Sequence, residues 1–567
     1  MTGLLMVLVA AVTVFIGTMG VRVIRGTDDF LLASRAISPG LNGAAVAGEY
    51  LSLASFLGIA GLILRNGVGV LWYAVGFAAG FVTLLIWVAG PLRRSGAFTV
   101  GDFAEMRFGS PVLRRVTGAM VLLISWVYLV PQLSGAGAVL HSTSGIPYWA
   151  GVAIAGAVTA ITVVAGGMRS ATYVQALQYT VKVLFLAIPA IVLVLLVSAA
   201  LRTDALHPER GTHFARATTV RFTADAELRT TEPVVVHSVS GSASVEWVAG
   251  PHRVSAGTMV TFPEGSEVPT VRGVPPLGGT AWRSALLDRS GAGHPLFETW
   301  SLLVATGLGT MGLPHVLLRF HTSPTGRSAR RTAVVTIGLL GVFYLFPGVY
   351  GLLGRVAAPQ LYLTGDTAEV VLATPASALG GHLGSALTAA VTAGAYAAFI
   401  SVSAGLLLTL AAGASHDLRA GTVRGLRLTV VAAAAVAVLL ALPAGRLDIS
   451  MVVGWAFALA AATLSPFLVL SLWWRGMTAV GAVTGVAAGA ISTLAAAAVS
   501  LLAPTDHGWW RVVVVQPAAW TVPLAFATMV LVSRLGHPPA SAEQLVLSLH
   551  VPDAAGPEWV QPRQRRD

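Results

Sequence analysis

The dominant feature of this sequence is a series of long apolar segments. A helix needs about 20 mostly apolar residues to cross the hydrocarbon core of a bilayer. We predict thirteen such spans, at 4–23, 40–64, 69–92, 115–141, 147–165, 171–200, 297–318, 332–355, 384–413, 425–445, 449–474, 479–503 and 513–533. Only 10% of the 567 residues are charged, against roughly 25% in soluble domains. The predicted fold class is an all-α polytopic membrane protein.

The arginines of the short connections predict the orientation of the helices. With the N-terminus outside, the outer short connections hold only Arg65, Arg355, Arg446 and Arg511, and the many others, from Arg22 to Arg475, fall on the inner side. Positive residues favour the cytoplasmic side, so we expect the N-terminus outside and the C-terminus in the cytoplasm. The first segment lacks a charged start and a cleavage site, which favours a retained helix over a signal peptide.

One connection, residues 201–296, is long and polar. Its alternating stretches, such as PVVVHSV and SASVEWV, are separated by Gly, Pro and Ser, a pattern typical of short β-strands. We predict a small β-rich extracytoplasmic insert, with a disordered loop as the alternative. The predicted domains are 1–200 (helices one to six, with a first core repeat from about residue 40), 201–296 (the insert), 297–533 (helices seven to thirteen) and 534–567 (a disordered cytoplasmic tail).

The motifs of soluble enzymes and ATP-driven pumps are absent from the sequence. We find no phosphate-binding loop, no H-E-x-x-H and no G-x-S-x-G in a strand context, and there is no cysteine. We therefore expect no enzymatic activity and no cofactor, and an ion gradient as the energy source. The single lysine among many arginines, Lys182, together with abundant Ala, Val and Gly, is typical of a GC-rich bacterial genome and so of a bacterial plasma membrane.

Two spans carry residues that interrupt a helix. Residues 44–61 contain Glu49 among small residues, and a carboxylate inside a span usually faces a cavity or a partner. Residues 301–320 contain Gly307, Gly309, Gly312 and Pro314, and proline costs about 3 kcal/mol in a helix interior. Broken helices of this kind form the midplane sites of secondary transporters. The two spans lie five helices apart, the spacing that two inverted five-helix repeats produce.

Other polar residues inside the spans are candidates for a cavity, with helix packing as the alternative. They are Tyr128, Gln132, Gln175, Gln178, Lys182, Ser401 and Ser403. Gln175 and Gln178 are three residues apart and share a helix face, and Lys182 needs a partner, for which Glu49 is a candidate. Buried serines such as Ser401 either ligate a hard cation or bond back to their own helix.

The chain resembles the sodium:solute symporter family, in particular its bacterial cation–acetate and monocarboxylate branch. The matching motifs include GPLRRSGAFTVGDFAEMRFGS, YLVPQLSGAG, GGMRSATYVQALQYTVK, GLPHVLLRF and WWRGMTAVGAVTG, in family order. The resemblance implies thirteen helices with a five-plus-five inverted-repeat (LeuT-like) core. It also implies a sodium site built by the backbone of Gly48, Leu51 and Ala398 and the hydroxyl of Ser401. The family often has a second hydroxyl where this chain has Val402, so either Ser403 replaces it or the coupling ion is a proton.

The expected function is cation-coupled symport, with sodium as the coupling ion, of a small organic solute. The resemblance favours acetate or another short monocarboxylate, carried by alternating access between the two sides of the bilayer. The expected partners are this solute, sodium and the lipid bilayer, and no nucleic acid. The residues expected to line the substrate cavity are Glu49, Tyr128, Gln132, Gln175, Gln178, Gly309 and Gly312. The alternatives are proton coupling, a proline, sugar or urea substrate, and a receptor that senses ligands through the insert.

Overall fold

The computed structural model describes residues 2–19, 26–208, 212–222, 225–238, 244–272, 274–288, 293–365, 369–414, 422–445, 449–502, 508–539 and 542–551. The helices of the first half are α1 (Thr2–Met19), α2 (Thr27–Leu32), η2 (Ala33–Arg35), α3 (Pro39–Tyr50), the π-helical turn η3 (Ala54–Gly58), α4 (Ile59–Asn66), η4 (Val68–Leu71), α5 (Trp72–Trp87), α6 (Ala89–Arg94), α7 (Val100–Phe108), α8 (Pro111–Ser144), α9 (Tyr148–Leu196) and α10 (Ala199–Leu206). Those of the second half are α11 (Pro295–Gly312), α12 (Pro314–His321), α13 (Gly326–Tyr344), α14 (Pro347–Ala357), α15 (Gln360–Thr364), α16 (Val370–Leu379), α17 (Gly381–Ala412), α18 (Val423–Ala444), α19 (Ile449–Ala462), α20 (Leu464–Trp473), α21 (Ala479–Leu502), α22 (Trp509–Val515), α23 (Ala518–Arg534) and α24 (Ala542–His550).

The helices account for every predicted span. Within the described residues, 9 helices are long and apolar enough to cross a membrane, and two bent pairs bring the number to 11. The 49-residue α9 covers most of two predicted spans, 147–165 and 171–200, which are joined by a kink at Gly167 (φ 53°, ψ −151°). A Cβ at Gly167 would lie 2.8 Å from the carbonyl oxygen of Phe30, so glycine is required there both sterically and conformationally. The shorter apolar helix α1 completes the predicted set.

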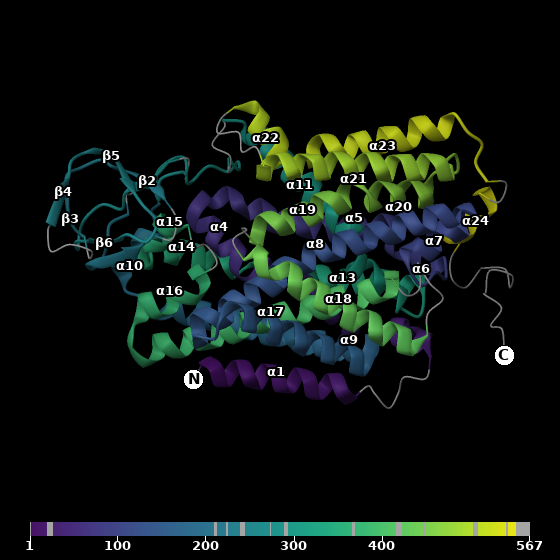
Figure 1. The fold of residues 1–567 in the computed structure, drawn as a ribbon, viewed down its shortest axis with the longest axis horizontal. Helices are drawn as coiled ribbons and strands as arrows, with labels where there is room; N and C mark the ends of the chain where they lie inside the picture. Colours follow the sequence, from purple (N-terminus) through teal and green to yellow (C-terminus); the bar gives the residue numbers. More distant parts are fainter. Residues whose placement is uncertain are drawn as a thin grey trace.

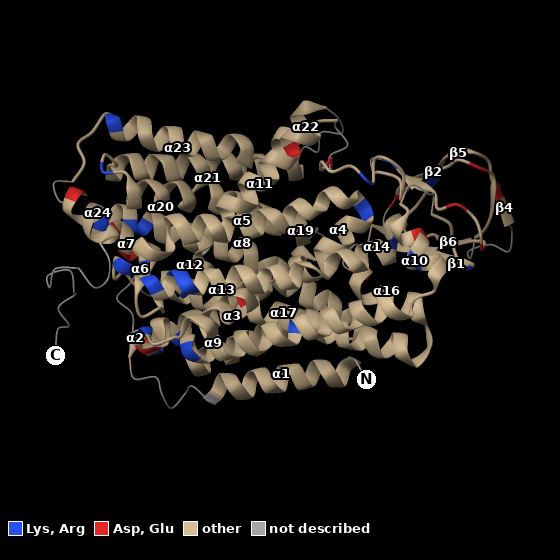
Figure 2. Ribbon diagram, turned by 180° about the vertical axis from the view of Figure 1, so that it is seen from behind, with Lys and Arg blue, Asp and Glu red and all other residues tan. Residues whose placement is uncertain are grey.

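The long helices form one bundle, and the insert projects from one of its ends (Figure 1). Helix α1 begins at the end that carries the insert, and α6, α7 and α24 lie at the opposite end (Figure 1). Charged residues gather at these two ends, while the middle of the bundle is almost free of them (Figure 2). This distribution is expected of helices whose middle turns face hydrocarbon or one another.

The insert contains seven short strands, β1 (Thr218–Arg221), β2 (Ala226–Thr230), β3 (Val234–Ser238), β4 (Ser244–Trp247), β5 (Gly250–Val254), β6 (Met259–Phe262) and β7 (Thr270–Val271). They form two antiparallel sheets with strand orders β1-β6-β3-β4 and β5-β2-β7. The predicted β-rich insert is therefore confirmed.

The segment after β7 attaches the insert to the membrane helices. The indole of Trp282 is fully buried and donates a hydrogen bond to the carbonyl of Leu64 at 3.0 Å. The amide of Val68 donates in turn to the carbonyl of Trp282 at 3.1 Å. A Cβ at Gly67 would lie 2.0 Å from that same carbonyl, and Gly67 has a φ of 83°. The insert is therefore seated directly on the loop that follows α4.

Both predicted broken helices are present. The pair formed by Pro39–Tyr50 and Ala54–Asn66 bends by 68°, and Leu51, at the break, has non-helical angles (φ −71°, ψ 85°). In the second span α11 ends at Gly312, Leu313 is extended (ψ 121°), and α12 restarts at Pro314. Proline fits the first turn of a helix because it has no amide hydrogen to donate. Gly307 and Gly309 remain inside α11, so the break is narrower than the glycine cluster predicted.

The predicted disordered tail contains structure. Residues Ala542–His550 form α24, which Arg94 of α6 contacts by donating to the carbonyl of Leu549 at 2.8 Å. The buried Ala542, Val546 and Leu549 lie on the face that packs against the bundle. Short amphipathic helices of this kind are stable only when an apolar face is covered, and here the end of the bundle covers it. Residues 552–567 of the predicted tail lie outside the described residues.

Candidate functional site

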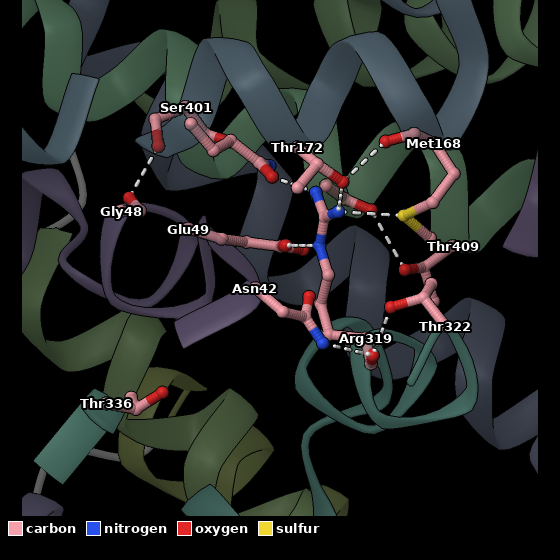
Figure 3. Close-up of polar contacts among 12 residues, drawn as sticks. Asn42, Gly48, Glu49, Met168, Thr172, Arg319, Thr322, Thr336, Ser401 and Thr409 are labelled. Atoms are coloured by element: carbon pink, nitrogen blue, oxygen red, sulfur yellow. Dashed lines mark hydrogen bonds and ion pairs between the residues drawn. The ribbon is translucent and has the colours of Figure 1, made fainter. Parts of the chain in front are cut away.

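The break after α3 brings a buried cation to free backbone carbonyls. Leu51 and Gly48 are at the end of α3, where carbonyls lack helical partners. The ammonium of Lys182 on α9 donates to the carbonyl of Leu51 at 2.7 Å and also to the carbonyl of Gly48. The hydroxyl of Ser401 on α17 donates to the same Gly48 carbonyl (Figure 3). Lys182 and Ser401 are both fully buried.

This cluster contains three of the residues predicted to bind sodium. Gly48, Leu51 and Ser401 lie together where the first broken helix meets α17. Lys182 was expected to need a partner, with Glu49 as the candidate, but its hydrogen bonds go to these two backbone carbonyls. Ser403 lies two residues further along α17, and its hydroxyl has no hydrogen-bond partner among the described residues.

Glu49 instead forms an ion pair with Arg319 of α12. The Nε of Arg319 lies 2.6 Å from the Oε2 of Glu49, with the two side chains 1% and 2% exposed. Arg319 also donates to the Thr172 hydroxyl at 2.7 Å and to the side-chain oxygen of Gln175, both on α9 (Figure 3). The carbonyl of Arg319 accepts from the amide of Asn42 at 3.0 Å. One guanidinium therefore connects both broken helices to α9.

Gln175 joins the ion pair to the lysine cluster. Its side-chain oxygen accepts from Arg319, and its side-chain nitrogen donates to the carbonyl of Ser401 at 2.9 Å. A polar chain thus runs from Lys182 through Gly48 and Ser401 to Gln175, Arg319 and Glu49. Such a connected network is strong only while every member keeps its partner, so a change at one end affects the other.

Two glycines allow these helices to approach closely. A Cβ at Gly48 would lie 2.1 Å from the carbonyl oxygen of Gln175, so α3 lies almost directly against α9. A Cβ at Gly405 of α17 would lie 1.7 Å from a carboxylate oxygen of Glu49. Real Cβ contacts are not that short, so Gly405 leaves the space in which the Glu49 side chain lies.

The remaining predicted cavity residues have different environments. Gln132 on α8 accepts from the amide of Leu53 at 3.1 Å and so caps the break after α3. The ring of Tyr128 is buried and edge-on to that of His315, with centroids 5.3 Å apart. Gln178 points to α1, where it donates to the Thr13 hydroxyl at 2.9 Å. The Gln178 side chain therefore contributes to packing between α9 and α1. Helix packing is the alternative considered above for polar residues inside the spans.

Gly309 and Gly312 provide close packing rather than cavity lining. A Cβ at Gly309 would lie 2.5 Å from the carbonyl oxygen of Phe457 on α19, and one at Gly312 would lie 2.3 Å from the hydroxyl oxygen of Ser465 on α20. Ala398 lies fully buried on α17, one turn before Ser401.

A cavity of about 110 Å³ lies directly beside the break after α3. Its lining is mostly apolar, with Phe77, Leu302, Phe457 and others, and its polar side chains are Ser52, Ser55, Tyr73, Thr306, Ser450 and Gln516. Among the described residues that line it, none is charged. The lining includes Leu62 of α4 and Gln516, at the bend between α22 and α23. The cavity therefore lies in the half of the bundle that carries the insert (Figure 1).

A smaller cavity, of about 10 Å³, lies in the opposite half of the bundle. It is lined by residues of α7, α8, α12 and α17, among them Leu318, His321 and Ala412. Of these two cavities, the larger lies toward the insert and the smaller toward the opposite end of the bundle.

Sequence reasoning missed Arg319 and His315 as candidate functional residues. Both belong to the motif GLPHVLLRF, and an arginine so close to a broken span is a signal by itself. Arg319 was assigned to an inner connection because it follows the apolar run. His315 is fully buried, and neither of its ring nitrogens has a hydrogen-bond partner in the described parts of the chain.

The fold and the site define the class of the protein, a secondary transporter with two broken core helices. The sequence model of the Sodium:solute symporter family matches residues 30–222 and 287–489. The chain belongs to this family. The match breaks between residues 222 and 287, where most of the strands of the insert lie.

Relatives and solved structures agree with this assignment. The chain is 29% identical over 498 residues to the uncharacterized symporter YwcA of Bacillus subtilis (strain 168), covering 85% of this chain and 83% of that protein. It is 28% identical over 480 residues to a monocarboxylic acid transporter of Corynebacterium glutamicum, covering 81% and 76%. A solved Na⁺-coupled sialic acid symporter in a substrate-bound outward-open state shares its fold, with a TM-score of 0.67 at 13% identity, covering 95% of this chain and 98% of that one. The chain is a solute symporter with the LeuT-like fold, not an enzyme, as predicted.

Proposed function

We propose that this protein carries a short monocarboxylate, such as acetate, pyruvate or propionate, across the membrane together with a cation. The observation that carries this proposal is the charge of the buried cluster beside the cavity. Lys182 and Arg319 are cationic and Glu49 is anionic, which leaves one positive charge when all three are ionised. An uncompensated charge inside a membrane is costly, and a monoanionic substrate would offset it.

The cavity supports a small and partly apolar substrate. Ser52 lines the cavity and directly follows Leu51 in the chain. The carbonyl of Leu51 accepts a hydrogen bond from Lys182. The N-terminal end of a helix carries a partial positive charge and attracts anions. After the break in the first span the helix restarts at Ala54, which lines the cavity. The apolar lining fits a methyl or ethyl group better than the many hydroxyls of a sugar. The monocarboxylic acid transporter among the relatives points to the same substrate class.

The proposed mechanism is alternating access controlled at the Glu49–Arg319 pair. In the present arrangement the substrate enters from the side of the insert, and the ion pair ties α3 to α12 and α9. A cation at the Gly48 and Leu51 carbonyls steadies the break in the first core helix. The opposite state requires α3 and α12 to separate, so both sites bias the same conformational equilibrium. We place the insert and the N-terminus outside a bacterial plasma membrane, in agreement with the arginine distribution.

Uptake into proteoliposomes tests this function. Labelled acetate, pyruvate and propionate are compared with proline, glucose and urea as solutes of the alternative classes. Exchange of labelled for unlabelled solute is measured first, because exchange needs no gradient. We expect exchange of one or more monocarboxylates and none of glucose or urea. Exchange of only a neutral solute would contradict the proposed substrate class, and its absence for every solute would favour the receptor alternative.

A further inference from the structure

The last part of the insert crosses the ends of three helices that line the larger cavity. Residues 282–287 form no helix or strand, yet Trp282 and Leu287 are buried, with 0% and 1% of their surface exposed. We call residues 282–287 the strap. Hydrogen bonds join the strap to α4, to α5 and to α11. Each of these helices also contributes side chains to the cavity wall.

Trp282 joins the strap to α4, the second half of the first broken helix. Its indole donates to the carbonyl of Leu64 at 3.0 Å, and its own carbonyl accepts from the amide of Val68 at 3.1 Å. Carbonyls in the last turn of a helix lack helical partners, so the strap supplies a donor that the end of α4 needs. A Cβ at Gly69 would lie 2.9 Å from the carbonyl oxygen of Leu286. The backbone of the strap therefore lies directly against the turn that follows α4.

Two further hydrogen bonds join the strap to the facing walls of the cavity. The indole of Trp72, the first residue of α5, donates to the carbonyl of Ala285 at 2.7 Å. The amide of Leu287 donates to the hydroxyl of Thr299 on α11 at 3.0 Å. Three residues further along α11, Leu302 lines the cavity. A single short segment therefore connects three walls of one cavity.

Arg355 of α14 joins the strap to the rest of the insert. This buried arginine donates to the Thr212 hydroxyl at 2.8 Å, near the beginning of the insert, and to the carbonyl of Leu277 at 2.9 Å, shortly before the strap. Its guanidinium lies over the ring of Trp282, 5.5 Å from the ring centroid, which is a favourable cation–π geometry. Helices α4 and α14 lie at the end of the bundle from which the strands project (Figure 1). The insert and the strap are thus anchored together on α14.

We propose that the strap controls access to the cavity from the side of the insert, and that Trp282 is the positioning residue that holds α4 there. A solute passes when the ends of α4, α5 and α11 separate, and this separation breaks hydrogen bonds of the strap. The inference rests on the proposed function, since it takes the larger cavity as the transport site. Trp282 is not among the described residues that line the cavity, so it acts through α4.

The strap favours the arrangement in which the three helix ends lie together. Loss of one buried hydrogen bond shifts such an equilibrium by about fivefold. The two access states of a transporter exclude each other, so greater access on the side of the insert means less access on the opposite side. A general loosening of the fold would instead raise access at both ends. This difference separates a positioning role from a merely structural one.

Single cysteines can report access at the two ends, because the sequence contains no cysteine. Ala305→Cys lies in the wall of the larger cavity, and Ala412→Cys lies in the wall of the smaller one. The rate of labelling by a water-soluble thiol reagent is measured for the full chain in nanodiscs, where the reagent reaches both faces. Trp282→Phe keeps an aromatic ring and removes the hydrogen bond to Leu64. We expect this variant to raise labelling at Ala305→Cys about fivefold and not to raise it at Ala412→Cys.

The matched control is Tyr362→Phe, which loosens the insert without touching the strap. The Tyr362 hydroxyl, on α15, accepts from the amide of Val271 at 3.1 Å and donates to the carbonyl of Pro275 at 3.0 Å. We expect its labelling rates to equal those of the parent. A second strap variant, Thr299→Val, removes the hydroxyl that accepts from Leu287 and should repeat the effect of the first.

Three outcomes would overturn the inference. They are an unchanged rate at Ala305→Cys in either strap variant, a rise at both cysteines, and an equal rise in Tyr362→Phe. The labelling requires no substrate. If proteoliposomes exchange no solute, the proposed function fails, and the labelling still decides whether the strap controls access to the cavity.

Discussion

The substitution Glu49→Gln tests the proposal that the Glu49–Arg319 pair keeps the transporter closed toward the end of the bundle that carries α6, α7 and α24. The pair Glu49–Arg319 has an Nε–Oε2 distance of 2.6 Å and almost no exposure. Removal of one partner from a buried ion pair costs about 3–5 kcal/mol, because the other charge is left without compensation. Thr172 and Gln175 remain as neutral acceptors for Arg319. On that scale the closed arrangement loses about 10²- to 10⁴-fold in its equilibrium with the open one.

A single introduced cysteine can measure this shift, because the chain contains none. Ala412, 1% exposed, lines the smaller cavity, and Ala412→Cys provides one labelling site there. We expect Glu49→Gln to raise the rate of labelling by a water-soluble thiol reagent by about two orders of magnitude or more, if opening limits the reaction. Transport should fall sharply, because the carrier can no longer favour one side.

The control for this experiment is Glu543→Gln. Glu543 pairs with Arg475, but the two side chains are 66% and 53% exposed, and exposed ion pairs contribute about 0–1 kcal/mol. Its labelling rate should equal that of the parent. The double variant Glu49→Gln with Arg319→Met should recover part of the closed state, because no unpaired charge remains. An equal labelling rate in Glu49→Gln and Glu543→Gln would refute the assignment of the pair as the closing contact.

Three further outcomes follow from the packing. In Gly405→Ala the new Cβ would lie 1.7 Å from a carboxylate oxygen of Glu49, so it should displace that carboxylate and raise labelling at Ala412→Cys as Glu49→Gln does. An unchanged labelling rate would mean that α17 moves aside instead. Ser401→Ala should lower the unfolding temperature, with a cost of about 1 kcal/mol, whereas Ser403→Ala should not, because its hydroxyl has no described partner; equal shifts in the two variants would contradict this. Trp282→Ala should make the insert sensitive to proteolysis, as loss of a buried tryptophan costs about 3–5 kcal/mol; resistance like that of the wild type would show that other contacts hold the insert.

The sequence alone determined the class, the spans and the position of the breaks. These properties depend on local chemistry, since a bilayer requires about 20 apolar residues for each helix and admits free backbone groups only at protected breaks. The spacing of the two broken spans was sufficient to predict the inverted repeats. The strands of the insert also followed from local alternation. The tail was predicted less well, because α24 is stable only where the end of the bundle covers its apolar face.

Only the tertiary structure decided which charged groups meet. From the sequence, Glu49 was one candidate partner for Lys182, since a charged group within the membrane needs a partner. The bend of 68° after α3 instead turns the Gly48 and Leu51 carbonyls toward Lys182, and the carboxylate of Glu49 lies against Arg319. Residues 270 positions apart form that ion pair, and no periodicity in the sequence encodes such a distance. The orientation of α3, α9 and α12 around this break determines that the Lys182 ammonium binds the two carbonyls and that the Arg319 guanidinium binds the Glu49 carboxylate.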